Sequence, residues 1–260
     1  MGARVIVITS GKGGVGKTTT TANIGAALAD KGHKVLLIDT DIGLRNLDVV
    51  MGLENRIVYD LIDVIEGRCR VSQALIKDKR CPNLVLLPAA QIRDKNDVNT
   101  DQMKELIFSL KESFDYILID CPAGIEQGFK NAIAAADEAI VVTTPEVSAT
   151  RDADRIIGLL EAAGIKSPRI VVNRLRIDMV KEKNMLSVED ILDILEVVPD
   201  DENVVISTNK GEPLVYKGDS LAAKAFKNIA SRIEGVEVPL LDLDIKMSIL
   251  EKIKFVFKRW

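Results

Sequence analysis

The feature that most constrains this chain is a glycine-rich stretch close to its N-terminus. Residues 11–18 read GKGGVGKT and fit the P-loop pattern G-x-x-x-x-G-K-[ST] at every fixed position. The apolar run before them, Arg4–Thr9, predicts a buried strand, and the run after them, Thr19–Lys31, predicts a helix that ends at Gly32. Since strand, glycine loop and helix in this order are the context that the pattern requires, we predict a binding site for nucleotide phosphates.

Each residue type in this stretch suits a triphosphate. Glycines let the backbone curl so that its N–H groups face the phosphates, and the N-terminus of the following helix adds a favourable dipole. Lys17 can bridge the β- and γ-phosphate oxygens, and the Thr18 hydroxyl can hold Mg²⁺. The residues predicted to contact the nucleotide here are Gly11, Lys12, Gly13, Gly14, Val15, Gly16, Lys17, Thr18 and Thr19.

A second lysine, Lys12, occupies the first variable position of the pattern. Phosphate binding does not require it, because Lys17 already supplies a cation, and a solvated surface lysine is the simpler interpretation. The form KGGVGKT nevertheless resembles the deviant Walker A motif of the MinD/ParA family of ATPases. This resemblance implies an α/β P-loop NTPase fold, with a mostly parallel sheet flanked by helices on both faces. It also implies a homodimer around two ATP molecules, in which Lys12 reaches the partner's phosphates and acts in catalysis together with Lys17.

Length and composition are compatible with one such domain. The chain has 260 residues, 47% of them hydrophobic and 28% charged, which is enough for a core without disulfides. Three widely spaced cysteines indicate a reducing cytosol, and we expect neither a signal peptide nor a transmembrane helix. The formal net charge of −4 argues against broad nucleic-acid binding.

Carboxylates follow the next predicted strand, Val35–Ile38. This strand ends in Asp39-Thr40-Asp41, and side chains at the C-terminal ends of parallel strands face the crevice where ligands bind. The residues after it, 42–48, resemble the switch I segment of the family. The resemblance implies that Asp41 positions the attacking water and that Asp39 lies near the metal ion. Either carboxylate could instead cap the short helix that starts near Asn46.

A second strand-end carboxylate is Asp120, after the apolar run Tyr116–Ile119. This arrangement matches a Walker B element, whose carboxylate takes part in Mg²⁺ coordination. Together with Cys121–Gly124 it resembles the family's switch II, D-x-P-A-G, in which the Gly124 N–H can sense the γ-phosphate. The predicted metal ligands are Thr18, Asp39 and Asp120.

Asn173 lies at the ligand-facing end of a further predicted strand, Arg169–Asn173. An asparagine amide both donates and accepts, which suits the edge of adenine. The resemblance implies that Asn173 reads the base, although asparagine is also common in turns at strand ends.

The C-terminal residues form an apolar stripe with basic flanks. Residues 245–260 hold five basic residues and one acidic residue, a net charge of +4 on an otherwise acidic chain. This pattern favours a helix on an anionic membrane surface and resembles the family's membrane-targeting sequence. A helix packed on its own domain is the alternative. The residues predicted to enter the membrane are Ile249, Leu250, Ile253, Val256, Phe257 and Trp260.

These features predict an ATPase domain at residues 1–236, a linker at 237–246 and an amphipathic membrane-targeting helix at 247–260. In order and spacing they resemble the MinD branch of the family, septum site-determining ATPases that recruit the division inhibitor MinC and are stimulated by MinE. The resemblance implies ATP and Mg²⁺ as cofactors, no nucleic-acid partner, and a place in the cytoplasm and on the inner face of the cytoplasmic membrane. A ParA-type DNA-partitioning ATPase, a flagellar-number regulator and a metabolic ATP-dependent ligase are the alternatives.

Overall fold

The fold is built on a central, mostly parallel β-sheet. The structure is a computed structural model that describes residues 2–93, 97–176 and 194–241. The predicted membrane-targeting helix, 247–260, lies outside the described residues, as does the second half of the predicted linker. Across the described ranges, no helix combines the length and the apolar character needed to cross a bilayer.

Within these ranges the sheet has eight strands, in the order β3-β4-β2-β5-β1-β6-β7-β8. Seven of them run parallel, and the short edge strand β3 pairs antiparallel with β4. The predicted mostly parallel sheet is therefore confirmed. The strands are β1 Arg4–Thr9, β2 Val35–Asp39, β3 Ile76–Lys77, β4 Leu84–Leu87, β5 Tyr116–Asp120, β6 Glu138–Thr143, β7 Arg169–Leu175 and β8 Ile194–Pro199.

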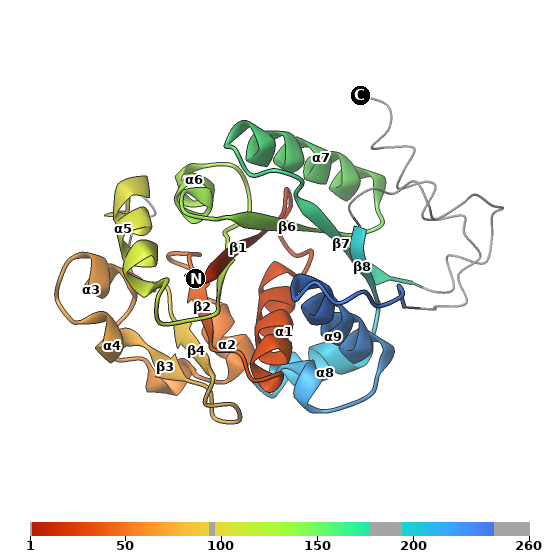
Figure 1. The fold of residues 1–260 in the computed structure, drawn as a ribbon, viewed down its shortest axis with the longest axis horizontal. Helices are drawn as coiled ribbons and strands as arrows, with labels where there is room; N and C mark the ends of the chain where they lie inside the picture. The colour runs from red at the N-terminus through yellow and green to blue at the C-terminus, as the bar shows by residue number, and fades with distance from the viewer. Residues whose placement is uncertain (1, 94–96, 177–193, 242–260) are drawn as a thin grey trace.

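Helices cover both faces of the sheet, as Figure 1 shows. One face is covered by α1 Lys17–Asp30, α2 Leu47–Met51, α8 Glu202–Asn209 and α9 Leu221–Ile233. The other face is covered by α3 Leu61–Ile65, α5 Thr100–Leu110, α6 Gln127–Ile133 and α7 Val147–Ala162, and the short helix α4, Val71–Ala74, precedes β3. The arrangement is the three-layer one expected when parallel strands alternate with crossover helices.

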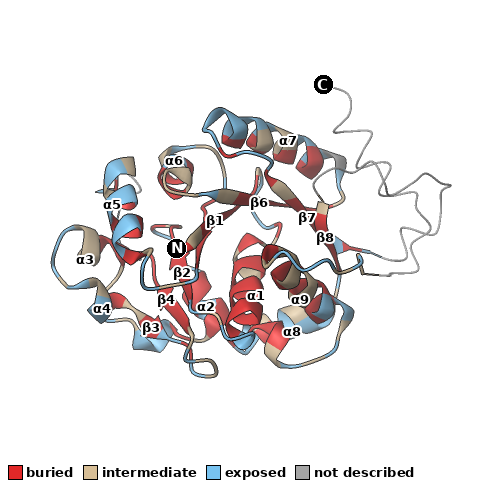
Figure 2. Ribbon diagram, in the orientation of Figure 1, coloured by how far each residue is buried: buried red, intermediate tan, exposed pale blue. Residues whose placement is uncertain are grey.

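The alternation of side chains along each strand divides the core into two clusters. In β1, Ile6 and Ile8 join the cluster under α1 and α9, whereas Val5 and Val7 join the cluster under α5, α6 and α7. Successive residues of a strand point to opposite faces, so a strand covered on both sides must be apolar throughout. This requirement explains why β1, β2 and β5 read as continuous apolar runs rather than as alternating ones. Figure 2 shows β1 and β2 as buried.

Helix α1 is buried on nearly all sides because it packs on the sheet and against its neighbours α2 and α9 on the same face. Eleven of its fourteen residues are buried, and Gly25 sits so close to β2 that an added Cβ would lie 2.5 Å from a Leu37 methyl carbon. Such burial accounts for the Ala-, Thr- and Gly-rich composition of the helix. The phosphate-binding loop is therefore attached to a helix that is buried along almost its whole length.

We predict that the contact between α9 and the sheet is essential for stability. Phe226 on α9 is completely buried, and truncation of a buried phenylalanine typically costs about 3–5 kcal/mol. We therefore expect Phe226→Ala to lower the free energy of unfolding by about this amount in urea denaturation. Phe108→Ala is the matched control, because Phe108 is 80% exposed on α5, and it should change the free energy by no more than about 0.5 kcal/mol. Equal losses in both variants would contradict this account.

Candidate nucleotide-binding site

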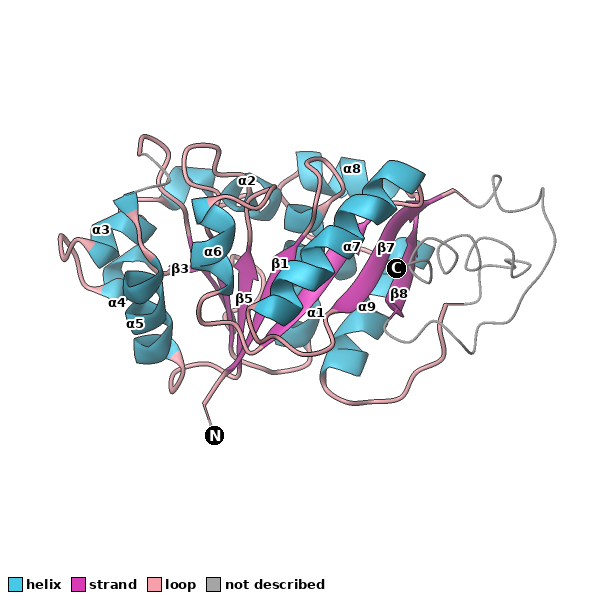
Figure 3. Cartoon of the chain, turned by 90° about the horizontal axis from the view of Figure 1, so that it is seen from above, coloured by secondary structure: helices cyan, strands magenta, loops and turns pink. Residues whose placement is uncertain are grey.

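The phosphate-binding loop connects β1 to α1 at the C-terminal edge of the sheet (Figure 3). Gly16 is the N-cap of α1, so no side chain caps this helix, and its first turn holds no acidic residue. Gly14 and Gly16 both have a positive φ, which other residues adopt at a cost. The uncapped N–H groups and the helix dipole together make a binding site for an anion.

Asn173 braces this loop from β7. Its Nδ2 donates a hydrogen bond to the Val15 carbonyl over 2.8 Å, and its side chain is buried. The same Nδ2 lies 2.3 Å from the position that a Cβ on Gly16 would take, so only glycine fits there. Since an amide group has a second N–H and a carbonyl oxygen, the bond to Val15 leaves capacity for a base. The reading of adenine by Asn173 stays a prediction, and the bond to the loop is a role that the sequence did not indicate.

The two lysines of the loop differ in their surroundings. Lys17 opens α1 and is 9% exposed, whereas Lys12 is exposed. The Lys12 carbonyl accepts a hydrogen bond from the Ser10 hydroxyl over 2.7 Å, which stabilises the turn that carries the side chain. Lys17 therefore lies within the site of its own chain, while Lys12 is accessible to a second molecule.

Asp39 and Asp120 end neighbouring strands and lie opposite each other in the register of β2 and β5. Both side chains are almost completely buried. Burial raises the pKa of each carboxyl above its usual value, and the nearby Asp39 raises the pKa of Asp120 further. Thr21 on α1 donates to the Asp120 carboxylate over 3.3 Å, and Thr18 also contacts it.

This arrangement fits a magnesium ion. Two buried carboxylates that repel each other are stabilised by a cation, and the donors present, Asp39, Asp120 and the Thr18 hydroxyl, are the hard oxygen ligands that Mg²⁺ prefers. No group of three His, Cys, Asp or Glu residues that could hold a metal ion occurs within the part of the chain that the structure describes. Mg²⁺ sites in nucleotide-binding proteins commonly take one or two ligands from carboxylates and others from substrate phosphates. The three metal ligands stay a prediction.

Asp39 also fulfils the capping alternative. Its carboxylate accepts hydrogen bonds from the N–H groups of Asn46 and Leu47, over 3.2 and 3.1 Å, at the start of α2. It accepts a third from the N–H of Asp41, over 2.9 Å. Because one carboxylate holds both ends of the loop at residues 40–46, a change in the surroundings of Asp39 will act on that loop directly.

Asp41, the predicted catalytic residue, begins this loop and is half-buried. Its carbonyl accepts hydrogen bonds from the N–H groups of Leu44 and Arg45, and Arg45 has a positive φ of 41°. The loop is thus a tight turn directly beside the carboxylate pair. This position is compatible with the predicted role of Asp41 in placing a water molecule, which stays a prediction.

The second predicted switch, Cys121–Gly124, leaves β5 beside the phosphate-binding loop. The Cys121 N–H donates to the Ile8 carbonyl over 3.0 Å, and a Cβ on Gly13 would lie 3.9 Å from the Ala123 Cβ. Gly124 has a φ of 94°. The segment therefore lies within reach of a ligand on the loop, as the motif predicts.

Helix α7 closes the other side of the loop. A Cβ on Gly11 would lie 2.5 Å from the Asp152 carbonyl oxygen, so the helix backbone rests directly on the loop. From the sequence, the acidic and basic cluster at residues 151–155 most simply predicts surface ion pairs, and the family resemblance implies that the start of this helix lies near a dimer face. No sequence motif indicates this contact. It requires glycine at residue 11, because a side chain there would collide with the backbone of α7.

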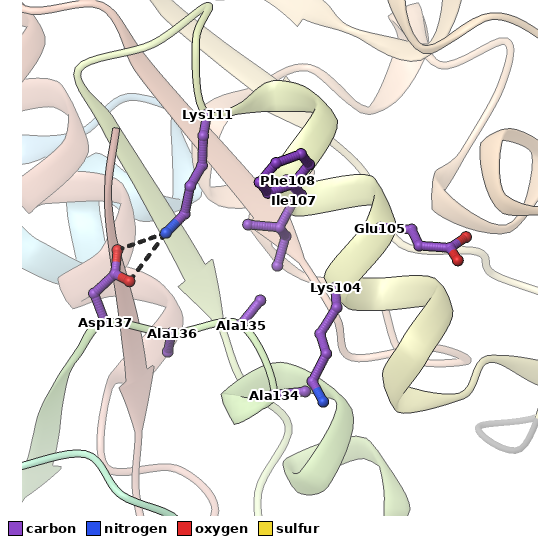
Figure 4. A pocket seen from close by; sticks show the side chains of 9 residues that line it. All are labelled: Lys104, Glu105, Ile107, Phe108, Lys111, Ala134, Ala135, Ala136 and Asp137. Carbon is purple, nitrogen blue, oxygen red and sulfur yellow. Dashed lines mark hydrogen bonds and ion pairs between the residues drawn. The ribbon is translucent and has the colours of Figure 1, made fainter. Parts of the chain in front are cut away.

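A pocket of about 520 Å³ between α5 and the end of α6 lies elsewhere (Figure 4). It lies where α5 and α6 end, before β5 and β6 begin, and therefore at the opposite edge of the sheet from the phosphate-binding loop. Its polar residues include Lys111 and Asp137, which are paired over 3.0 Å. The pocket has no part in the nucleotide site.

Comparison with known proteins assigns the family. A family model described as an AAA domain matches residues 3–167. The septum site-determining protein MinD of Synechocystis sp. is 62% identical over 245 residues, which cover 92% of this chain and 92% of that protein. The chain belongs to the MinD family.

Solved structures of MinD proteins agree with this assignment. The MinC:MinD cell division protein complex of Aquifex aeolicus matches with a TM-score of 0.83 at 51% identity, over 92% of this chain and 98% of that one. MinD of Pyrococcus horikoshii, complexed with Mg-ADP, matches with a TM-score of 0.78 at 34% identity, over 89% and 96% of the two chains. The predicted MinD/ParA resemblance, the fold, the ATPase class and the role in cell division are confirmed.

We predict that Asp120→Asn stabilises the nucleotide-free protein and at the same time disables it. An amide in place of Asp120 removes the repulsion from Asp39 and keeps an oxygen that can accept from Thr21. Each kcal/mol relieved should raise Tm by about 2–4 °C in a chain of this size. The further rise in Tm that Mg-ATP produces should fall, because a metal ligand is lost. Asp219→Asn, at an exposed loop position, is the control. A variant with unchanged Tm and an unchanged response to Mg-ATP would contradict the account.

Proposed function

We propose that this chain is an ATP-driven membrane switch that helps to place the division septum by recruiting a division inhibitor. The observation that carries the proposal is the convergence of three features at one edge of the sheet. These are an uncapped helix N-terminus under a glycine loop, the buried Lys17, and the carboxylate pair Asp39 and Asp120. Together they suit the phosphates and the metal ion of Mg-ATP.

In this proposal each predicted catalytic residue has a separate task. Lys17 neutralises charge on the phosphates bound by its own chain, and Asp41 orients the attacking water. Lys12 crosses to the phosphates of a second copy, which its exposure supports. When bound, Mg²⁺ supplies positive charge at the β- and γ-phosphates. The ATP-bound homodimer is then the active form of the switch.

The division inhibitor in the proposal is MinC. The support is the solved complex of MinC with the Aquifex aeolicus MinD, which is 51% identical to this chain. Stimulation by MinE is part of the proposal on the grounds of the family alone. A DNA-partitioning role is less well supported, because the chain has a net charge of −4.

Membrane association is assigned to residues 247–260, on their sequence. Six apolar side chains, half buried at an interface, contribute about 5–9 kcal/mol, since full burial contributes about 1.5–3 kcal/mol each. Ordering about a dozen residues costs a comparable amount, so one tail binds only weakly. Two tails on one ATP dimer make the second insertion intramolecular, and this avidity can raise binding by about 10²–10⁴. The proposed place of action is therefore the inner face of the cytoplasmic membrane, reached from the cytoplasm.

The two lysines of the loop should have separable effects. We expect Lys17→Ala to abolish nucleotide binding, because the phosphates lose their buried cation. Lys12→Ala should keep the affinity of the monomer for ATP but lose ATP-dependent dimerisation, measured by light scattering, and hydrolysis. Lys34→Ala, an exposed lysine before β2 at the other edge of the sheet, is the control and should change neither. An ATP-dependent dimer of Lys12→Ala would refute the assigned role of Lys12.

The tail should bind vesicles only when it is paired. We expect Ile253→Glu to abolish ATP-dependent sedimentation with anionic vesicles, while ATP binding stays unchanged. Phe255→Glu is the matched control, since residue 255 lies off the apolar stripe, and it should retain most of the binding. A coiled coil fused to the chain should restore membrane binding without ATP. If the ADP-bound wild type sediments as fully as the ATP form, pairing is not the switch.

A further inference from the structure

Glu196 is an unusual residue for the last strand of a sheet. It lies in β8, at the edge of the sheet, and its side chain is completely buried. A buried carboxylate is costly unless charged and polar partners surround it. An apolar side chain at this position would stabilise the core equally well or better, so stability alone does not explain the residue.

The partners of Glu196 come mainly from the chain that follows it. Oε2 accepts hydrogen bonds from Asn228 Nδ2 and from Arg232 Nη1, both over 3.0 Å and both from α9. Oε1 accepts from the N–H of Val197 over 3.0 Å and from the N–H of Leu241 over 3.3 Å. One carboxylate thus joins the edge strand, α9 and the segment beyond α9.

Arg232 makes the second connection to that segment. Its Nη2 donates to the Val238 carbonyl over 2.9 Å, while Nη1 contacts Glu196 and the Leu195 carbonyl. The Leu241 side chain packs against the apolar clusters on both sides of β8. The hydrogen bonds at the Val238 carbonyl and at the Leu241 N–H therefore hold residues 238–241 on the sheet edge. Figure 1 shows the segment after α9 passing beside β8.

We propose that Glu196 and Arg232 form a linker clamp, which fixes the point from which the C-terminal tail leaves the domain. The two are positioning residues for the tail. Residues 237–241 are then part of the domain, although the sequence suggested a linker that starts at residue 237. The inference rests on the proposed function, in that it requires the tail to bind lipid.

The clamp sets the length of the tether. Ile249, the first residue of the apolar stripe, is eight positions beyond Leu241 and sixteen positions beyond Ile233, where α9 ends. Once a tether is long enough to reach the membrane, the effective concentration of the second tail there falls roughly as the −3/2 power of tether length. Release of the clamp doubles the tether and should therefore lower this concentration about threefold. The clamp thus strengthens the binding of the second tail of an ATP dimer.

Vesicle titrations of the full chain test the proposal. In Arg232→Lys the charge stays, but a single ammonium cannot contact Glu196, Leu195 and Val238 together. We expect this variant to need about threefold more vesicle lipid (phosphatidylglycerol-rich) for half-maximal binding with ATP. Insertion of eight Gly and Ser residues after Leu241 lengthens the tether to the same extent with the clamp intact, and it should reproduce this shift. ATP turnover and dimerisation should be unchanged in both.

Arg169→Lys is the matched control. Arg169 pairs with Glu138 over 2.9 Å in the same sheet, and among the described residues this pair makes no hydrogen bond or ion pair with residues 237–241. This variant should lose comparable stability and bind vesicles as the wild type does. If Arg232→Lys and Arg169→Lys weaken vesicle binding equally, or if only the insertion weakens it, the clamp does not set the tether.

Hydrogen exchange at the Leu241 amide tests the clamp without lipid. We expect this amide to be protected in the wild type and in Arg169→Lys, and to lose protection in Arg232→Lys. Leu241→Pro, which removes this N–H donor and leaves Glu196 and Arg232 in place, replaces Arg232→Lys in the titration if that variant does not fold. A Leu241 amide that exchanges freely in the wild type overturns the clamp. Wild-type protein that fails to bind vesicles with ATP while the amide is protected overturns the tether role and the membrane function together.

Discussion

Two carboxylates that repel each other are the constraint on which the rest of the site depends. Asp39 and Asp120 are buried side by side at the ends of β2 and β5, where water cannot screen them. The domain tolerates them because backbone N–H groups bind Asp39 and hydroxyl groups of α1 bind Asp120. This support is partial, since the pKa of both groups remains raised. The nucleotide-free domain is therefore strained at the point where a cation would relieve it, and ligand binding and stability are coupled.

The same pair connects the site to its surroundings. Asp39 holds the start of α2 and the turn that carries Asp41, so the predicted switch I segment is attached to one member of the repelling pair. A metal ion that draws on Asp39 competes with the N–H groups of Asn46 and Leu47. Because of this competition, binding at the site can change the conformation of the loop at residues 40–46 without any movement of the sheet.

Much of the fold could be predicted because its signals are local. The apolar runs of β1, β2 and β5 and the glycine loop each lie within a few residues of sequence, and the structure places them as expected. Helices α6 and α8 were not expected. They are short and lack a sustained apolar stripe, so packing rather than periodicity determines them.

The contacts that complete the site could not be predicted, because they join distant residues. Nothing near Gly16 in the sequence indicates that Asn173 fills the space beside it, and nothing near Gly11 indicates the backbone of Asp152. Glu196 is a similar case. A glutamate within the run ILEVVP suggests a solvent-facing position, and only its partners on α9 and at Leu241 explain its burial.

The central position of β1 determines when the nucleotide-binding site can form during synthesis of the chain. The phosphate-binding loop leaves the ribosome first, but β1 lies between β5 and β6, and the bond that braces the loop joins residues 158 positions apart. A nascent chain that ends before Asn173 carries the motif without the walls that shape it. ATP therefore has no complete site on a chain that has not yet reached Asn173, and two such chains on neighbouring ribosomes cannot pair around it.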